Sequence, residues 1–451
     1  VAALGTTSLI FGQTLNRKAS LGIRPSLVDE VAAKKMKLEG GGGILIQQVF
    51  PNSTCEKLGV RANDVLLSIN GNATTTMPEL MAAIKPLRDQ TPVSLNIWRD
   101  GKELTLSGKA VGRPMETSAH GEVLYGSVPF RGGRLRTIIN RPKGEGSFPA
   151  IFFIPGYPCS SVDNLNPIHP YKQLIEGFAE EGFVVMRTEK AFVGDSEGKL
   201  DCNEIDFATE NEGFLAAYKT FRDLEYVDPN QLFIFGHSMG CVSTPVLARQ
   251  VVPKGVMVYG TVYEPWSEYL LKMLRYQKNL SGEEPLKVEQ DMRDHAKLLY
   301  QHYTEKTTLS ELEKDTTFAR LLAADFQYDG NNHLFTRNAS FWQGVHETNL
   351  TEAWQQTPSY VLSIYGEADF EVFDPESMKG IIRIVNHYHP GKGEFLFLPN
   401  TNHSFIEVGS MEKGLELKGS QEMIKYYQEH FSQALVEKCA AWMRDKEGKR
   451  F

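Results

Sequence analysis

From Gly121 onward, short runs of consecutive apolar residues alternate with longer stretches of helical periodicity. Runs of this kind, bounded by turn residues, are typical of strands that are buried on both faces of a sheet. They occur at residues 150–154, 183–186, 232–235, 255–259, 360–365 and 394–398. The alternation predicts an α/β fold with a mostly parallel sheet and helices on both faces. Between about residues 264 and 354 it stops, and a charged, helix-favouring stretch predicts an inserted helical cap.

The N-terminal part of the chain has a different pattern, in which short strand-like runs are separated by turn signals between Leu21 and about Ala110. One run ends in an Asn70-Gly71 turn, and Asp100-Gly101 lies between two further runs, as in a tight β-hairpin. We therefore predict a tail or signal-peptide remnant, a small β-rich domain and an α/β domain, at residues 1–20, 21–112 and 113–451. Because the first segment begins with an apolar run, we favour a secreted or periplasmic bacterial protein, with a cytoplasmic location as the alternative.

The order of elements in the small domain resembles a PDZ domain of the type found in bacterial HtrA proteases. The resemblance rests on Leu21-Gly22-Ile23, on LGVRANDVLLSINGNA at 58–73 and on PELMAAI at 78–84. It implies that the backbone N–H groups of Leu21, Gly22 and Ile23 bind the terminal carboxylate of a peptide, which adds a strand to the edge of the sheet. The alternative is a module that packs against its neighbour and binds nothing.

Composition narrows the range of partners. Apolar residues make up 41% and charged residues 23% of the 451, so the chain has ample material for a packed core and is not a disordered protein. The net charge of -8 argues against a general affinity for nucleic acid or for an anionic membrane surface. No run approaches the ~20 apolar residues that a membrane-spanning helix needs.

The spacing of cysteine and histidine predicts neither a metal site nor a cofactor. The cysteines are odd in number and widely spaced, which argues against a disulfide scaffold and against a zinc site; they lie at positions 55, 159, 202, 241 and 439. His387 and His389 lie two residues apart at the end of a helical pattern, where two ligands point in different directions.

A nucleophile motif occurs where a predicted strand meets a predicted helix. Gly236-His237-Ser238-Met239-Gly240 follows the apolar run 231–235 and precedes the helix-compatible segment 242–251. The G-x-S-x-G pattern is weak by itself, but this strand-turn-helix context is the one that a nucleophile elbow requires. The glycines leave room for a tight turn, and the helix N-terminus stabilises negative charge beside the serine. Ser238 is therefore the predicted nucleophile.

A serine nucleophile needs a base and a carboxylate that orients the base. His403 lies in a loop just beyond the last predicted strand, and Asp369 follows the strand before it. Glu367, Glu371 and Asp374 in the same loop as Asp369 remain alternatives for the acid, although Asp369 is favoured. The chain order Ser, Asp, His is the order expected of an α/β-hydrolase.

An oxyanion hole needs two N–H donors that point at the tetrahedral oxygen. One is expected from Met239, the residue after the nucleophile. The second is expected from Tyr157, in the loop Pro155-Gly156-Tyr157-Pro158 that follows the predicted strand 150–154. The phenol of Tyr157 is either a further donor or a packing group.

Residues from about 121 to 451 resemble an α/β-hydrolase of the serine esterase, prolyl-oligopeptidase and dienelactone-hydrolase kind. The matching segments keep the order of the family and are YGSVPFRGGRL, FPAIFFIPGYP, GDSEG, VDPNQLFIFGHSMG, YGEAD and NTNHSF. Two positions depart from the usual pattern, because Pro155-Gly156 replaces His-Gly and Cys241 replaces a second glycine. Neither departure removes a reacting group.

The resemblance implies an acyl-enzyme mechanism that uses no cofactor. We interpret the chain as a carboxylesterase-type serine hydrolase (EC 3.1.1) that acts on small esters with short to medium acyl chains. A serine peptidase of the prolyl or dipeptidyl type is the first alternative, and a peptide-binding adaptor with an idle hydrolase fold is the second. The aromatic residues of the cap either line an acyl pocket or form the core of the cap, and they are Trp266, Tyr269, Phe335, Phe341 and Trp342.

Overall fold

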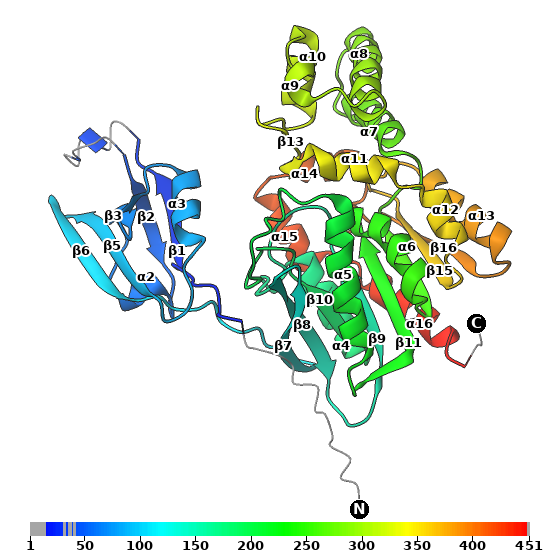
Figure 1. Cartoon of the computed structure of the whole chain (residues 1–451), viewed down its shortest axis with the longest axis horizontal. Helices are drawn as coiled ribbons and strands as arrows, with labels where there is room; N and C mark the ends of the chain where they lie inside the picture. The colour runs from blue at the N-terminus through cyan, green and yellow to red at the C-terminus, as the bar shows by residue number, and fades with distance from the viewer. Residues whose placement is uncertain (1–14, 30–32, 35–37, 39–41, 449–451) are drawn as a thin grey trace, which may run out of the picture. The chain divides into compact units, whose positions relative to one another are not determined.

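The computed structural model describes residues 15–29, 33–34, 38 and 42–448. Residues 1–14 of the predicted tail lie outside this part of the chain. The described residues divide into two compact units, Leu15–Glu116 and Thr117 onward (Figure 1). Each unit has its own sheet and its own hydrophobic core.

The N-terminal unit is built on an antiparallel sheet with the strand order β1-β2-β3-β5-β6, and β4 pairs with β3. Its strands and helices are β1 (Ile23–Leu27), β2 (Ile44–Val49), α2 (Thr54–Lys57), β3 (Val65–Ile69), β4 (Asn72–Ala73), α3 (Met77–Ile84), β5 (Pro92–Arg99) and β6 (Lys102–Lys109). Alternate residues of the strands enter one core, among them Ile44 and Ile46. The hydroxyl of Thr76 accepts a hydrogen bond from the amide of Glu79, and the Glu79 carboxylate accepts one from the amide of Thr76. This capping box fixes the start of α3.

The second unit is built on an eight-stranded sheet with the order β16-β15-β12-β11-β9-β10-β8-β7. Its strands are β7 (Gly121–Phe130), β8 (Gly133–Pro142), β9 (Phe148–Ile154), β10 (Val184–Thr188), β11 (Val227–His237), β12 (Gly255–Tyr259), β15 (Tyr360–Gly366) and β16 (Gly393–Leu398). From β10 to β16, neighbouring strands pair in parallel, which confirms the predicted α/β-hydrolase fold. The antiparallel hairpin of β7 and β8 was not predicted, because polar residues such as Arg136 and Asn140 are buried in β8 and interrupt its apolar pattern.

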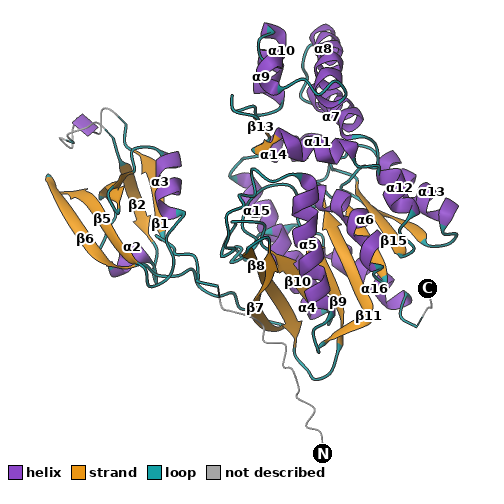
Figure 2. Ribbon diagram, in the orientation of Figure 1, coloured by secondary structure: helices purple, strands orange, loops and turns teal. Residues whose placement is uncertain are grey.

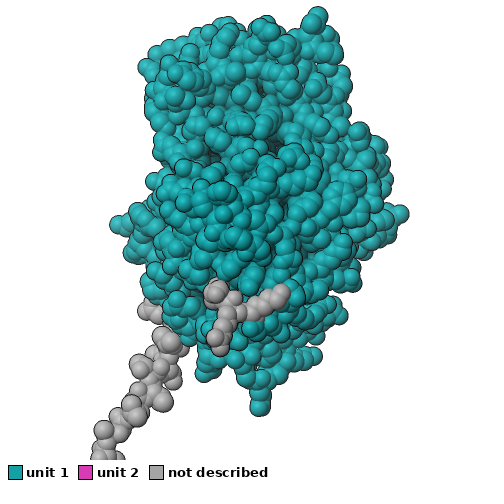
Figure 3. Space-filling view, turned by 90° about the vertical axis from the view of Figure 1, so that its right-hand side faces the viewer, with its two compact units in different colours: residues 1–14, 117–451 teal, residues 15–116 magenta. Residues whose placement is uncertain are grey.

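Helices cover both faces of this sheet (Figure 2). Outside the cap they are α4 (Pro170–Glu180), α5 (Phe207–Arg222), α6 (Met239–Val251), α13 (Glu376–Tyr388), α14 (Met411–Leu417), α15 (Glu422–Glu429) and α16 (Gln433–Asp445). Ile151 and Phe153 of β9 share one core with residues of α4 and α16. Phe152 and Ile154 enter the opposite core together with residues of α5 and α6. Side chains fill the spaces between the ribbons when one face of this unit is drawn with all its atoms (Figure 3).

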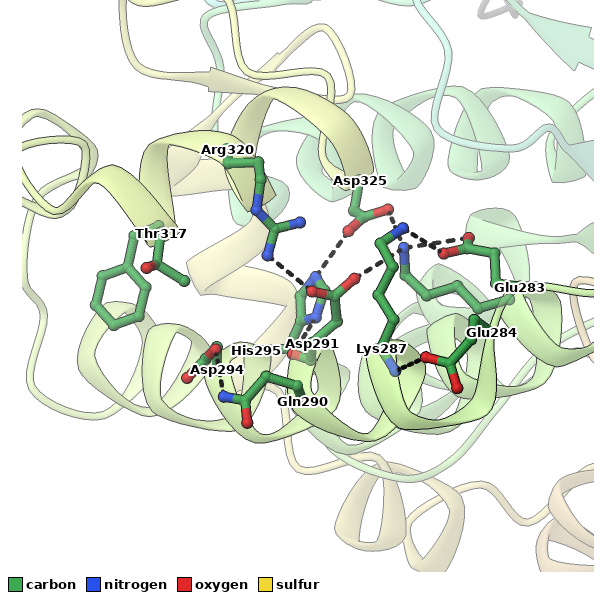
Figure 4. A network of polar contacts seen from close by, with 12 residues as sticks. Glu283, Glu284, Lys287, Gln290, Asp291, Asp294, His295, Thr317, Arg320 and Asp325 are labelled. Carbon is green, nitrogen blue, oxygen red and sulfur yellow. Dashed lines mark hydrogen bonds and ion pairs between the residues drawn. The ribbon is translucent and has the colours of Figure 1, made fainter.

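The segment between β12 and β15 forms the helical cap. Its elements are α7 (Trp266–Leu280), α8 (Pro285–Tyr303), α9 (Leu309–Leu312), α10 (Thr316–Asp325), β13 (His333–Leu334), β14 (Arg337–Asn338), α11 (Ala339–Glu347) and α12 (Leu350–Gln355). A polar network joins α7, α8 and α10 (Figure 4). The carboxylate of Asp325 lies 3.0 Å from Nε2 of the buried His295 and 3.0 Å from Nζ of Lys278. Asp291 pairs with Arg320 at 2.7 Å, so both carboxylates have a cationic partner within the cap.

A disulfide joins Cys159 and Cys202, a pairing that the sequence analysis did not predict. The two Cα atoms are 5.8 Å apart although 43 positions separate the residues along the chain. The pair is not visible in the spacing, because the fold alone brings the loop after β9 beside the segment before α5. Cys55, Cys241 and Cys439 are buried free thiols.

Within the described part of the chain, no helix combines the length and the apolar character needed to cross a membrane. The same residues contain no group of three or more His, Cys, Asp or Glu side chains placed to hold a metal ion.

Candidate active site

The predicted nucleophile lies at a sharp turn between a strand and a helix. β11 ends at His237 and α6 begins at Met239, while Ser238 between them has a φ of 55° and a ψ of -125°. This strained conformation is the one that exposes the serine of a nucleophile elbow. A Cβ atom at Gly240 would lie 2.2 Å from the carbonyl oxygen of Ile154, so only glycine fits where α6 meets β9.

The predicted base and acid come from the loops after neighbouring strands β16 and β15. Asp369 is fully buried, and its Oδ2 lies 2.8 Å from Nδ1 of His403. Its Oδ1 accepts hydrogen bonds of 2.9 Å from the amides of Glu371 and Val372. Because these contacts fix the carboxylate, it keeps the proton of the neutral imidazole on Nδ1 and leaves Nε2 free to act as the base.

The other acidic residues of the β15 loop lie differently. Glu367 and Asp374 accept hydrogen bonds from nearby backbone amides. Glu371 has its Oε2 3.4 Å from Nε2 of His403, whereas Asp369 contacts Nδ1. Of the acids weighed from the sequence, Asp369 is therefore the one placed to orient the imidazole.

The candidate residues border a common cavity of about 70 Å³. Ser238 and His403 line it together with Met239 and Tyr157, the two predicted oxyanion donors. The amides of Met239 and Tyr157 have no backbone or side-chain acceptor among the described residues. Segments that are far apart in sequence thus bring a hydroxyl, an imidazole and two N–H donors around one space.

The imidazole of His403 lies between two carboxylates. Burial disfavours its protonated form, but the negative charges of Asp369 and Glu371 outweigh burial and raise the pKa of His403 to about 9. An imidazole must be neutral to accept a proton, so this site is short of active base at neutral pH when it is empty.

Two buried cations hold the loop that carries Tyr157. Nζ of Lys190 donates to the carbonyl oxygens of Gly156 at 2.7 Å and of Tyr157 at 3.0 Å. Arg337 of β14 donates to the same Tyr157 oxygen at 2.9 Å. The C=O and N–H of one planar peptide point in opposite directions, so the bond to Gly156 turns the Tyr157 amide away from Lys190.

Glu210 of α5 pairs with both of these cations, at 3.2 Å from Lys190 and 2.9 Å from Arg337. All three side chains are buried. Burial lowers the pKa of Lys190 to about 8, although the charge of Glu210 favours the protonated form. Sequence analysis missed this group because its members are isolated charges that belong to no motif. The only signal is that Lys190 lies two residues beyond the end of a fully buried strand, β10.

His237 connects the loop of Gly156 with the loop of His403. One ring nitrogen, Nε2, donates to the carbonyl oxygen of His403 at 2.8 Å, so Nδ1 accepts from the hydroxyl of Tyr171 at 2.7 Å. The Tyr171 oxygen in turn accepts from the amide of Gly156 at 3.3 Å. Burial holds the pKa of His237 well below its usual range, and the neutral ring supplies the one donor and one acceptor that this chain of hydrogen bonds needs.

The predicted peptide-binding loop of the N-terminal unit directly precedes β1. Leu21 is buried, Gly22 has a φ of 66°, and Ile23 is the first residue of the strand. The amides of Leu21 and Gly22 have no backbone acceptor in the described part of the chain. β1 also stands at one end of the strand order, so one of its edges has no partner strand among the described residues.

Residues 19–109 match the PDZ domain family. This segment is a PDZ domain. The periplasmic serine endoprotease DegP of Escherichia coli K12 is 29% identical over 136 residues, which cover 30% of this chain and 27% of DegP. Esterase EstD of Thermotoga maritima is 28% identical over 145 residues, 32% of this chain and 34% of EstD. The chain therefore matches only about a quarter to a third of the length of these relatives.

Solved structures with a similar course of the chain include Est1E from Butyrivibrio proteoclasticus, with a TM-score of 0.43 and 11% identity. That match covers 72% of this chain and 99% of Est1E. A soluble variant of monoglyceride lipase from Saccharomyces cerevisiae has the same TM-score of 0.43 at 14% identity, and covers 75% of this chain and 98% of its own. These similarities concern the fold alone.

Proposed function

We propose that this protein is a serine hydrolase that cleaves carboxylic esters through an acyl-enzyme on Ser238. The observation that carries the proposal is the shared cavity. This cavity is lined by Ser238 on its strained turn, by His403 and by Met239 and Tyr157, whose amides have no acceptor in the part of the chain that the structure describes. Asp369 orients His403 from behind through the bond to Nδ1. A peptide-binding adaptor has no need of this full set.

In the proposed reaction, Oγ of Ser238 attacks the ester carbonyl while Nε2 of His403 accepts the hydroxyl proton. Asp369 stabilises the resulting imidazolium, and the Met239 and Tyr157 amides donate to the developing oxyanion. The intermediate then loses the alcohol, which takes its proton from His403. Water attacks the acyl-enzyme by the same steps, releasing the acid and restoring the Ser238 hydroxyl.

We expect ester hydrolysis to rise with pH, because deprotonation of His403 creates the base. With a pKa of about 9, kcat/KM increases roughly tenfold per pH unit between pH 6 and 8 and levels off above pH 9. The measurement is the hydrolysis of a p-nitrophenyl ester across this range, corrected for spontaneous hydrolysis. A plateau already reached at pH 7 would contradict the influence of the two carboxylates on His403.

We expect Lys190→Met to lower kcat by about 10²-fold with little change in KM, because the Tyr157 amide loses its fixed direction. Steady-state kinetics with one ester measures both constants. Lys172→Met is the matched control, since Lys172 is also buried and paired with a glutamate, Glu176, at 2.9 Å. A Lys190→Met protein that is less heat-stable but retains the native kcat would contradict the positioning role.

A larger cavity of about 360 Å³ adjoins the first and shares Tyr157, Trp266 and Tyr269 with it. Trp266 stacks on Trp342 with ring centroids 5.0 Å apart, and both rings line the larger cavity. Phe341 is buried and packs edge-on against Trp342, with ring centroids 5.1 Å apart. The aromatic residues thus supply an apolar wall for a short to medium acyl chain as well as part of the cap core.

A substrate panel tests the proposed reaction against the peptidase alternative. We expect the full chain to hydrolyse p-nitrophenyl esters from acetate to octanoate, and to cleave Pro and Ala p-nitroanilides far more slowly. Anilide cleavage at rates equal to or above those of the esters would replace the esterase by a prolyl or dipeptidyl peptidase.

For the PDZ domain we propose binding of a peptide C-terminus beside β1, with the carboxylate at Leu21, Gly22 and Ile23. The free amides of the first two residues and the unpaired edge of β1 support this. Fluorescence titration with a peptide ending in apolar residues should show binding that is lost when its C-terminus is amidated. Equal binding of both forms would argue against carboxylate recognition.

A further inference from the structure

Glu371 is set apart from the other charged residues at the candidate site by its surroundings. It lines both the cavity at Ser238 and the larger aromatic cavity beside it. Its side chain is 37% exposed, and its carboxylate pairs with no lysine or arginine among the described residues. Its only ionic contact there is the one of 3.4 Å to Nε2 of His403. The carboxylate is therefore available to a ligand that enters either cavity.

Without a bound cation, the contact between Glu371 and His403 opposes catalysis, because it favours the protonated form of the imidazole. Nε2 is the atom that must accept the proton of Ser238, and a carboxylate beside it stabilises the protonated ring. The charge of Glu371 contributes to the raised pKa of His403. A positive charge bound to Glu371 would offset the contribution of this residue and lower the pKa of His403, while Asp369 continues to raise it. The arrangement therefore favours a substrate that brings a cation to Glu371 over a neutral substrate of the same shape.

The walls beside Glu371 suit the same kind of ligand. Trp266, Tyr269, Trp342 and Phe335 line the larger cavity, and aromatic faces attract ammonium groups. Burial and the negative charge of Glu371 raise the pKa of Tyr269 well above its usual range, which keeps its hydroxyl neutral.

The other charges of the larger cavity are those of Asp325 and Lys418. Asp325 is already paired with Lys278 and His295, so Glu371 is the carboxylate left for a ligand. Lys418 lies 5.2 Å from the ring centroid of Phe370 and is the cation on this cavity wall. A ligand that carries a negative charge would bind Lys418 instead of Glu371, so esters of opposite charge distinguish the two binding modes.

Resting on the proposed hydrolase function, we propose that Glu371 binds an ammonium group of the substrate, and that the preferred esters of this protein carry a positive charge. Glu371 would then act as a specificity residue, because the charge it recognises also releases His403 to act as a base.

Pairs of esters that differ in charge but not in shape test this proposal. The p-nitrophenyl esters of 6-aminohexanoate and heptanoate place the difference on the acyl side. Acetylcholine and 3,3-dimethylbutyl acetate place it on the alcohol side. The mono-p-nitrophenyl ester of pimelate supplies the anionic member of the acyl series. The kcat/KM of each ester is measured for the native protein, for Glu371→Gln, and for Asp325→Asn as the matched carboxylate of the same cavity.

We expect the cationic member of at least one pair to be preferred by about tenfold or more, and the preference to disappear in Glu371→Gln but to persist in Asp325→Asn. The apparent pKa of the Glu371→Gln pH profile should also fall. An equal loss on charged and neutral esters in Glu371→Gln would overturn the proposal, because the residue would then act through His403 alone. A preference for the anionic ester would overturn it in favour of Lys418. Absence of turnover on every ester, together with no labelling by a fluorophosphonate, would instead refute the hydrolase function, and this inference with it.

Discussion

Ser238→Ala is expected to abolish ester hydrolysis, lowering kcat by at least about 10⁴-fold. We propose that this hydroxyl forms the acyl-enzyme, so its removal leaves only binding and oxyanion stabilisation. Alanine retains the Cβ atom and removes only Oγ, so the turn with a φ of 55° and the packing of α6 are unaffected. Steady-state hydrolysis of p-nitrophenyl butyrate measures the loss, and circular dichroism with a thermal melt measures the fold.

A double variant sharpens this result. Because Ser238 and His403 act as one unit, the variant Ser238→Ala with His403→Ala should lose no more activity than either single variant. Ser243→Ala, five positions further along α6, is the serine control and should retain activity within a few-fold. Near-native rates in Ser238→Ala, or additive losses in the double variant, would remove Ser238 from the mechanism.

Asp369→Asn is expected to cost about 10⁴-fold in kcat while retaining the shape of the site. Oδ1 of Asp369 accepts hydrogen bonds from the amides of Glu371 and Val372, so the oxygen of an asparagine will occupy that position. Its NH₂ group then faces Nδ1 of His403 and forces this nitrogen to accept. The ring proton moves to Nε2, which can no longer take the proton of Ser238. The comparison of kcat for the variant and the native protein at about pH 9 measures this effect.

The matched control for Asp369→Asn is Asp195→Asn, since Asp195 is also buried and lies 3.1 Å from Nε of Arg136. Loss of this ion pair is expected to reduce stability without the loss of kcat seen for Asp369→Asn. If Asp369→Asn retained most of its activity, the orienting acid would have to be sought elsewhere, with Glu371 as the first candidate because it contacts the other ring nitrogen.

The features that the sequence predicted are those with local signals. The parallel strands are continuous apolar runs, and the flanking glycines, which leave room for close packing, predict the turn at Ser238. Local sequence signals also predict the PDZ domain, through its capped helix α3 and the hairpin of β5 and β6. Such elements can be predicted because residues close in sequence determine them.

The features that were missed depend on contacts between distant segments. Cys159 and Cys202 are brought together only by the fold. Lys190 and Arg337 meet at the carbonyl of Tyr157 from positions 147 residues apart, from 190 to 337. In the sequence, Glu371 is one of several loop acids, and only the packing of two loops places it beside Nε2 of His403. No periodicity or motif carries this information, because the pairing is a property of the tertiary structure.

We propose that side chains far apart in the sequence converge to make the hydroxyl of Ser238 reactive. The most direct test is to incubate the folded protein with a fluorophosphonate and to map the labelled peptide. We expect a single adduct on Ser238, strongly slowed labelling in His403→Ala and no labelling in Ser238→Ala. Labelling of a different serine, or no labelling of the folded native protein, would contradict it.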